Sequence, residues 1–180
     1  MAMLRVPVSP RDHRLGDENA SVVVVEYGDY ECPHCAAAHP VTKRITQDYG
    51  DRLSFAFRHF PMTEVHPHSG TAAEAAEFAG ARGMFWPMHD LIFANSHRLS
   101  VSLLLALAAS LRLSQIEMRD ELASHVHLPK VQADFIGGVR SGVNGTPTFF
   151  INGQRHERTY AYPDLAAAID DAMMGRQVVA

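Results

Sequence analysis

Both cysteines of this 180-residue chain lie in the stretch GDYECPHC, residues 28–35. Cys32 and Cys35 are separated by Pro33 and His34. A CxxC pair of this kind suits metal ligation, a structural disulfide, or reversible disulfide exchange with other thiols. A disulfide here would close so small a loop that it would hardly restrain the unfolded chain, so the structural role is the least favoured of the three.

Zinc binding is the main rival to redox chemistry. A structural zinc site needs about four Cys or His ligands, and the chain has no second CxxC pair. The other ligands would have to come from the eleven histidines, among them His59, His66, His68 and His89, which lie near the ends of predicted strands and helices. We therefore expect neither a metal ion nor a cofactor at the cysteine pair.

Disulfide exchange requires a thiolate, and the start of a helix favours one at Cys32. A free cysteine has a pKa of about 8.5 and is mostly protonated at neutral pH. Pro33 suits the first position of a helix, so Cys32 lies where unpaired backbone N–H groups and the helix dipole stabilise an anion. His34 adds an N–H donor or a positive charge in the same turn. We expect an exposed Cys32 to attack partners, and a shielded Cys35 one turn further on to complete the exchange.

Acidic residues precede the pair. Asp29 and Glu31 place negative charge near Cys32, which should raise the pKa of that thiol and oppose the effect of His34. Glu26 falls at the end of a predicted strand, where one interpretation is a carboxylate that reaches solvent.

The elements that position the cysteines follow from the hydrophobic pattern. A continuous β-branched run predicts a buried, central parallel strand at about residues 22–27. Apolar spacing predicts a helix from Pro33 to Tyr49, which Gly50 ends. In residues 52–60, large apolar side chains alternate with smaller or polar ones, and this pattern predicts a second strand. Strand, helix and strand together make a βαβ unit.

The rest of the chain is mostly helical in pattern. Five segments between residues 63 and 141 and just beyond predict helices, namely 68–81, 84–95, 100–111, 114–126 and 128–143. Asn152-Gly153 is a strong hairpin signal that joins two antiparallel strands, and a last helix is predicted at 163–174. Residues 3–8 alternate, but Pro7 restricts them to an edge strand at most.

Four motifs together resemble the DsbA-like members of the thioredoxin superfamily, namely GDYECPHC, FRHFP, FWPMHDLIF and VNGTPTFFING. They match in order and roughly in spacing from about Ser21 onward. The resemblance implies an α/β protein with a thioredoxin-like fold and an inserted α-helical domain. Residues 1–62 and 142–180 would form the thioredoxin-like domain, and residues 63–141 the helical insertion. The implied activity is that of a bacterial thiol-disulfide oxidoreductase.

The resemblance also assigns roles outside the CxxC pair. It implies that the Thr146-Pro147 peptide bond is cis and lies beside Cys32. The backbone of Thr146 would pair with an extended substrate segment, and Pro147 would keep metals and other strands from the cysteines. Glu26 matches a buried acid that handles the proton of Cys35.

Composition excludes some partners. The net charge of −4 comes from 16 basic and 20 acidic residues without a basic cluster, so nucleic acid is not an expected partner. No apolar run approaches the roughly 20 residues that span a bilayer, so we expect no membrane anchor. The N-terminal residues lack a secretory signal pattern. This favours the cytoplasm, or the periplasm or the exterior if the chain is the mature form of a longer precursor.

The expected partners are protein thiols and disulfides, with glutathione or an unknown redox protein as electron partner. The direction of electron flow stays open. The Pro33-His34 dipeptide between the cysteines favours an oxidant, whereas a cytoplasmic location favours a reductase or isomerase. The alternative function is a noncatalytic thioredoxin-like binding module, or a protein whose CxxC holds a metal or cluster.

Overall fold

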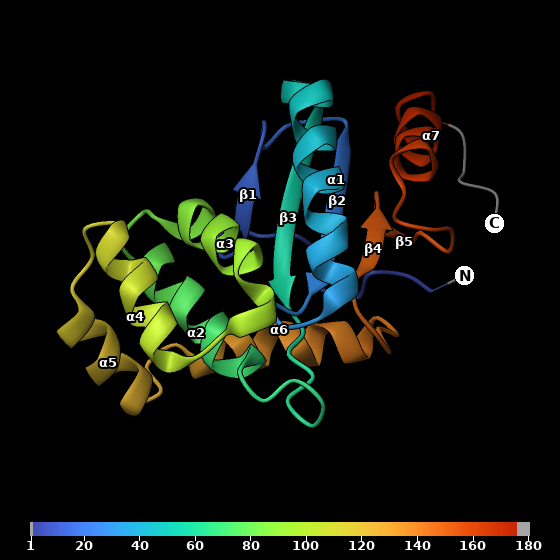
Figure 1. The fold of residues 1–180 in the computed structure, drawn as a ribbon. Coiled ribbons are helices and arrows are strands. Elements are labelled where there is room, and N and C mark those ends of the chain that lie inside the picture. The colour runs from blue at the N-terminus through green and yellow to red at the C-terminus, as the bar shows by residue number, and fades with distance from the viewer. Residues whose placement is uncertain (1, 176–180) are drawn as a thin grey trace.

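The computed structural model describes residues 2–175 and is built around one mixed β-sheet (Figure 1). Its strands are β1 (His13–Leu15), β2 (Val22–Gly28), β3 (Leu53–His59), β4 (Thr148–Ile151) and β5 (Gln154–Arg155), in the order β1-β3-β2-β4-β5. The middle strand β2 runs parallel to β3 and antiparallel to β4. The predicted central strand, its parallel neighbour and the Asn152-Gly153 hairpin are therefore confirmed.

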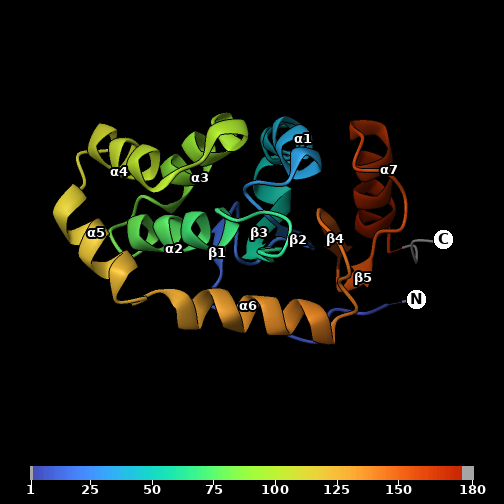
Figure 2. The same cartoon turned by 60° about the horizontal axis from the view of Figure 1, so that its bottom comes forward.

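Helices cover both faces of this sheet. Helices α1 (Pro33–Tyr49) and α7 (Tyr162–Met173) lie on one face, and α6 (Leu128–Arg140) runs along the other (Figure 2). All seven residues of β3 are buried, which two covered faces require. Short 3-10 helices occupy Gly50–Arg52 and Ser96–Arg98.

Four further helices form a bundle at the β1 side of the sheet (Figure 1). They are α2 (Ser69–Gly80), α3 (Phe85–Ala94), α4 (Val101–Ser110) and α5 (Gln115–Ala123). Phe85 and Met88, both on α3, are buried in the main core. Of the described helices, none is long and apolar enough to cross a membrane.

Helix α6 connects the helical bundle to the far face of the sheet. A Cβ atom added at Gly138 would lie 2.7 Å from a ring carbon of Phe60 and 3.0 Å from one of Tyr27. Glycine therefore lets α6 approach the aromatic side chains beneath the sheet closely. The sequence places α6 in the helical insertion, and the structure shows that it also covers the sheet.

The predicted edge strand at residues 3–8 is wrong. Met3 makes only an isolated bridge to Gln154, and the edge strand is β1, which pairs antiparallel with β3. Backbone hydrogen bonds join Leu4 to the carbonyl of Gly153 at 2.8 Å and the carbonyl of Ala2 to Arg155 at 3.0 Å. Further along the segment, the guanidinium of Arg58 donates to the carbonyls of Val6 and Pro7 at 2.8 and 2.9 Å.

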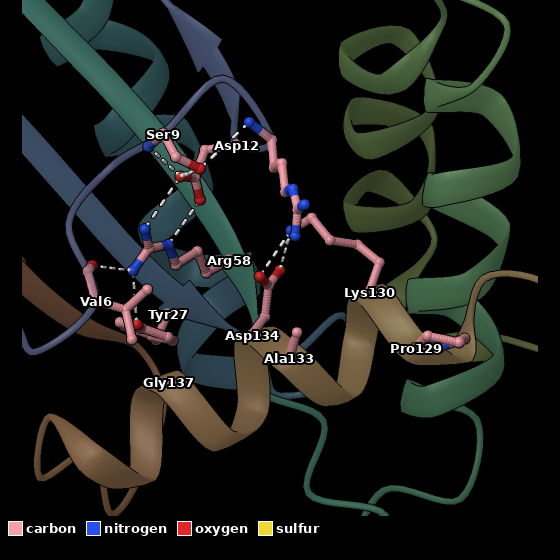
Figure 3. A pocket seen from close by; sticks show the side chains of 11 residues that line it. Val6, Ser9, Asp12, Tyr27, Arg58, Pro129, Lys130, Ala133, Asp134 and Gly137 are labelled. Atoms are coloured by element: carbon pink, nitrogen blue, oxygen red, sulfur yellow. Dashed lines mark hydrogen bonds and ion pairs between the residues drawn. The ribbon is translucent and has the colours of Figure 1, made fainter.

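Arg58 also forms a buried ion pair with Asp12, in which its Nε lies 2.7 Å from Oδ1 (Figure 3). Burial is the largest single influence on Asp12 and opposes its ionisation. The hydrogen bonds from Arg58 and the backbone of Ser9, together with the positive charge of Arg58, outweigh burial and hold the pKa of that carboxyl below its usual value. The pair lines a pocket of about 430 Å³ between the N-terminal segment and α6. Arg58 thus connects β3 to the N-terminal segment at Val6, Pro7 and Asp12.

Candidate active site

The two cysteines lie at the start of α1. Cys32 precedes the helix with extended backbone angles, and Pro33 takes the first helical position, as predicted. The two sulfurs are unbonded. Cys35 is fully buried, as expected for the shielded thiol. Cys32 is also buried, with only 5 % of its surface exposed, so the prediction of an exposed attacking thiol is wrong. The turn before the helix and the loop around Thr146 shield its sulfur, which lies 3.4 Å from the Thr146 carbonyl oxygen.

Hydrogen bonds make Cys32 unusually acidic. The thiol of Cys35 is the strongest donor to its sulfur, and the side chain of Thr146 and the backbone N–H groups of Cys35 and His34 add to it. Burial acts in the opposite direction. The donors prevail and lower the pKa of Cys32 to about 5.

Cys35 behaves in the opposite way. Burial is the main reason that its pKa lies well above the ordinary value, and the hydrogen bond to Cys32 and the charge of Glu26 raise it further. The backbone N–H of Asp29, 3.4 Å from the Cys35 sulfur, only partly offsets this. The pair therefore combines one thiol that ionises readily with one that keeps its proton.

Glu26 lies within β2, inside the protein. Its side chain is buried, and burial raises its pKa to about 8. Among the described residues, no group donates a hydrogen bond to its Oε1. The interpretation as a solvent-exposed strand end is therefore wrong, and the residue is protonated at neutral pH.

His34 has a different neighbour from the one expected. Its side chain is exposed, and its Nδ1 lies 3.4 Å from the hydroxyl of Tyr160. Its contribution to the acidity of Cys32 comes through the backbone N–H. Tyr160, in the loop before α7, is a neighbour that no sequence motif indicates.

The loop between α6 and β4 brings Thr146 and Pro147 to the cysteines. The Thr146-Pro147 peptide bond is cis. The Thr146 carbonyl oxygen accepts a hydrogen bond from the thiol of Cys32 at 3.4 Å. The Thr146 hydroxyl also contacts the sulfur of Met62 at 3.9 Å, so the segment after β3 reaches the same site.

Sequence reasoning missed two pairs of residues at this site. Asp29 lies 2.8 Å from the Nδ1 of His66, and Glu31 lies 2.9 Å from the Nδ1 of His68. The matched spacing was the available signal, since the two acids and the two histidines are each two positions apart.

Potential metal ligands gather elsewhere. Within residues 2–175, one group of His, Cys and carboxylate side chains has the closeness that a metal ion requires, namely His59, Glu77 and Asp134. Neither cysteine belongs to it, and the Nζ of Lys130 already lies 2.6 Å from Asp134. The Nδ1 of His89 instead forms a 2.9 Å hydrogen bond with the hydroxyl of Tyr30.

Comparison with known proteins shows the family to which this chain belongs. A family model described as thioredoxin matches residues 8–171. The chain belongs to this thioredoxin family. Among solved structures of the family's fold, BdbD from Bacillus subtilis has a TM-score of 0.86 at 24 % identity, covering 97 % of this chain and 99 % of that one.

Two other solved structures show the same DsbA-like fold. Wolbachia pipientis α-DsbA1 has a TM-score of 0.78 at 23 % identity, with 96 % of this chain and 97 % of that chain covered. The catalytic domain of Proteus mirabilis ScsC has a TM-score of 0.79 at 21 % identity, with 92 % and 91 % covered. The thioredoxin-like fold with its added helices is therefore confirmed.

Curated relatives with higher identity carry another name. A Na(+)/H(+) antiporter NhaA 1 of Salinispora arenicola is 43 % identical over 176 residues, which are 97 % of this chain and 27 % of that protein. A Na(+)/H(+) antiporter NhaA of Herminiimonas arsenicoxydans is 36 % identical, with 96 % and 28 % covered. This chain spans about a quarter of the length of these relatives.

Proposed function

We propose that this protein is a thiol-disulfide oxidoreductase that exchanges disulfides with protein thiols through Cys32 and Cys35. The observation that carries the proposal is the contrast between the two thiols, in which the pKa of Cys32 is lowered to about 5 while that of Cys35 is raised. Such a contrast suits one attacking and one resolving sulfur. The DsbA-like fold supports the same activity.

The proposed reaction starts from the Cys32–Cys35 disulfide. A substrate thiolate attacks the Cys32 sulfur, the bond to Cys35 breaks, and Cys35 leaves as a thiolate that takes up a proton. A second substrate thiolate then attacks the substrate sulfur of the mixed disulfide. Cys32 leaves as a thiolate, the substrate holds a disulfide, and the enzyme holds two reduced cysteines. A disulfide partner, either glutathione disulfide or a redox protein, takes up the two electrons when it reoxidises the enzyme.

The acidity of Cys32 favours the oxidising direction. A stabilised Cys32 thiolate stabilises the reduced enzyme and is also a good leaving group, so its disulfide is readily reduced by substrates. Cytosolic glutathione and thioredoxin would keep such a pair reduced. We therefore favour an oxidising compartment, such as the bacterial periplasm or the cell exterior, over the cytoplasm.

Three other residues have proposed roles in this reaction. Glu26, with its pKa raised to about 8, holds a proton that it gives to Cys35 as that sulfur leaves. Thr146 presents backbone next to Cys32, where an extended substrate segment would pair with it. Pro147 has no N–H group and blocks further pairing at that position.

The first experiment separates this proposal from a noncatalytic or metal-binding module. Wild-type protein is assayed for oxidation of a reduced peptide and for reduction of insulin disulfides, next to Cys32→Ser and Cys35→Ser, with metal analysis of the purified protein. We expect both activities in the wild type, neither in Cys32→Ser, and a trapped mixed disulfide in Cys35→Ser. Stoichiometric metal together with full activity in Cys32→Ser would exclude the redox function.

A second experiment tests the direction. The fraction of Cys32–Cys35 disulfide is measured in glutathione buffers of known composition. We expect a potential well above the about −270 mV of thioredoxin. A value as low as that of thioredoxin would favour a reductase.

The antiporter name belongs to relatives about four times as long as this chain. Our proposal rests on the cysteine chemistry of the segment that they share with it. In those relatives we propose the same thiol-disulfide exchange for the matching quarter of the protein.

A further inference from the structure

The segment between β3 and α2 folds against the turn that precedes Cys32. In Figure 1 it forms the turquoise loop that continues from the end of β3 toward α2. Two of its histidines, His66 and His68, each contact one acid of that turn. The loop and the turn are more than thirty residues apart in sequence, so these contacts are tertiary.

The carboxylate of Asp29 is buried and held by three donors. Its Oδ2 accepts hydrogen bonds from the Nδ1 of His66 and the backbone N–H of Met62, both at 2.8 Å. Its Oδ1 accepts from the backbone N–H of Glu31 at 2.8 Å. The side chain of Asp29 has no exposed surface. A buried carboxylate needs such donors, and His66 is the one of the three that also supplies a positive charge when protonated.

Glu31 is held in the same manner by a single residue. Its Oε2 accepts from the backbone N–H of His68 at 2.7 Å, and its Oε1 lies 2.9 Å from the Nδ1 of that residue. The side chain of Glu31 is 19 % exposed. This second pair therefore lies closer to the surface than the first.

The acidic turn also contacts the cysteines. The backbone N–H of Asp29 donates to the Cys35 sulfur at 3.4 Å, and its carbonyl accepts from the N–H of Cys32 at 3.2 Å. Negative charges on Asp29 and Glu31, which precede Cys32 by three positions and one position, would disfavour a further charge on its sulfur. A paired carboxylate opposes the thiolate less than an unpaired one.

We propose that His66 and His68 are positioning residues for Cys32, which pair with Asp29 and Glu31 and so keep the acidic turn from disfavouring the Cys32 thiolate. The inference rests on the proposed function and adds to it. The loop then controls how oxidising the cysteine pair is, although neither histidine contacts the reacting sulfur. Its Met62, beside both Asp29 and Thr146, links the loop to the other wall of the site.

The test uses His66→Asn and His68→Asn, because asparagine retains an N–H donor near the position of Nδ1 but never carries a positive charge. Two quantities are measured, the acid dissociation constant of the Cys32 thiol by thiolate absorbance, and the equilibrium with glutathione. We expect the dissociation constant to fall about tenfold in the double variant. We expect the equilibrium constant for oxidation of glutathione by the Cys32–Cys35 disulfide to fall by a similar factor. A tenfold fall corresponds to a reduction potential lower by about 30 mV.

A matched control lies far from the cysteines. His125 pairs with Glu74 through its Nδ1 at 3.0 Å, which is the same kind of contact in the helical bundle. Its backbone φ of 52° is one that asparagine tolerates. His125→Asn should leave both quantities unchanged.

A paired variant tests whether the effect passes through the carboxylate. Adding His66→Asn to Asp29→Asn should change neither quantity. An effect of full size in that background would overturn the proposal, as would wild-type values in folded His66→Asn/His68→Asn.

A further variant, Glu31→Gln, decides the question should the histidine variants not fold. It leaves His68 without its partner, so the dissociation constant of the Cys32 thiol should rise, and a fall or no change would contradict us.

The two quantities also separate this inference from the proposed function. Failure of wild-type protein to exchange with glutathione or peptide thiols would defeat the function. The absorbance titration needs no exchange partner, so it still tests whether the histidines control the Cys32 thiolate.

Discussion

At the scale of single residues, the site depends on two sulfurs one helical turn apart that ionise very differently. Cys32 is surrounded by donors, whereas Cys35 is fully buried and donates. The strongest single effect on the pKa of Cys32 is the hydrogen bond from the other thiol of the pair. Each cysteine thus changes the pKa of the other.

This interdependence predicts how two replacements of Cys35 differ. Cys35→Ser keeps a hydroxyl donor, so the Cys32 thiol should still titrate near pH 5. Cys35→Ala removes the donor, so the pKa of Cys32 should move toward its ordinary value. Absorbance at 240 nm against pH measures both, and equal midpoints for the two variants would show that the backbone donors alone suffice.

Glu26 gives a prediction about stability. Its folded-state pKa of about 8 lies above the unfolded value of 4.5, so the native protein retains a proton that the unfolded chain loses. Wild type and Glu26→Gln should therefore be similarly stable below pH 4.5. As the pH rises to 8, the wild type should become less stable than Glu26→Gln, by on the order of 4 kcal/mol. Urea unfolding at pH 4 and pH 8 measures the difference, and a pH-independent one would place Glu26 in contact with solvent.

At the scale of elements, the N-terminal segment is joined to the sheet by polar contacts of Arg58. Figure 3 shows its contacts with Asp12, Tyr27 and the carbonyl of Val6, and Arg58 also donates to the carbonyl of Pro7. Both partners of the ion pair are nearly inaccessible, with side chains 3 % and 4 % exposed. Breaking a buried pair leaves a charge without a partner, which is far more destabilising than losing a surface pair.

We therefore expect Asp12→Asn to lower the free energy of unfolding at pH 7 by about 3 kcal/mol. The folded-state pKa of Asp12 is below the unfolded value of 3.8, so its stabilising effect is present above pH 3.8 and is lost as the pH falls through the folded value. The difference in the free energy of unfolding between wild type and Asp12→Asn should then shrink as the pH falls below 3.8. Urea unfolding measures it, with the exposed pair of Arg44 and Asp48 as control, where Asp48→Asn should change the stability by less than about 1 kcal/mol.

At the scale of the whole molecule, the acidity of Cys32 links the redox state to stability. The pKa of Cys32 is about 5 in the native protein and 9.0 in the unfolded chain. The stabilisation of the reduced protein by the Cys32 thiolate is therefore complete above pH 9.0 and is lost as the pH falls through about 5. We expect reduced protein to unfold at higher urea concentration than oxidised protein at pH 7, and the difference to narrow by pH 4. An oxidised form that is the more stable one at pH 7 would contradict the proposed oxidant.

Short-range patterns made much of this fold predictable. The strand before GDYECPHC, the helix that Pro33 begins and the Asn152-Gly153 hairpin each depend on neighbouring residues, and each appears where expected. The covering of the sheet by α6 depends instead on close packing at Gly138, which no periodicity reveals. The same holds for β1, whose three residues are too few for a pattern.

The candidate site divides along the same line. The sequence indicates the cysteines, and the resemblance to DsbA-like proteins indicates Thr146, Pro147 and Glu26. The pairs of Asp29 with His66 and Glu31 with His68 join segments that meet only after the chain folds. Asp29 and Glu31 therefore look like unpaired charges in the sequence, although their histidine partners lie next to them in the folded protein.

The near-complete burial of Cys32 has a consequence for when the protein can act on its clients. Cys32 is only 5 % exposed, and its sulfur lies 3.4 Å from the Thr146 carbonyl oxygen. Under the proposed function, we expect a cysteine in the rigid surface of a folded domain to reach this sulfur poorly. A newly made chain, still extended on both sides of its cysteine, can lie along that backbone and reach it. Under the proposed function, we therefore expect unfolded or partly folded polypeptides to be better substrates than fully folded proteins.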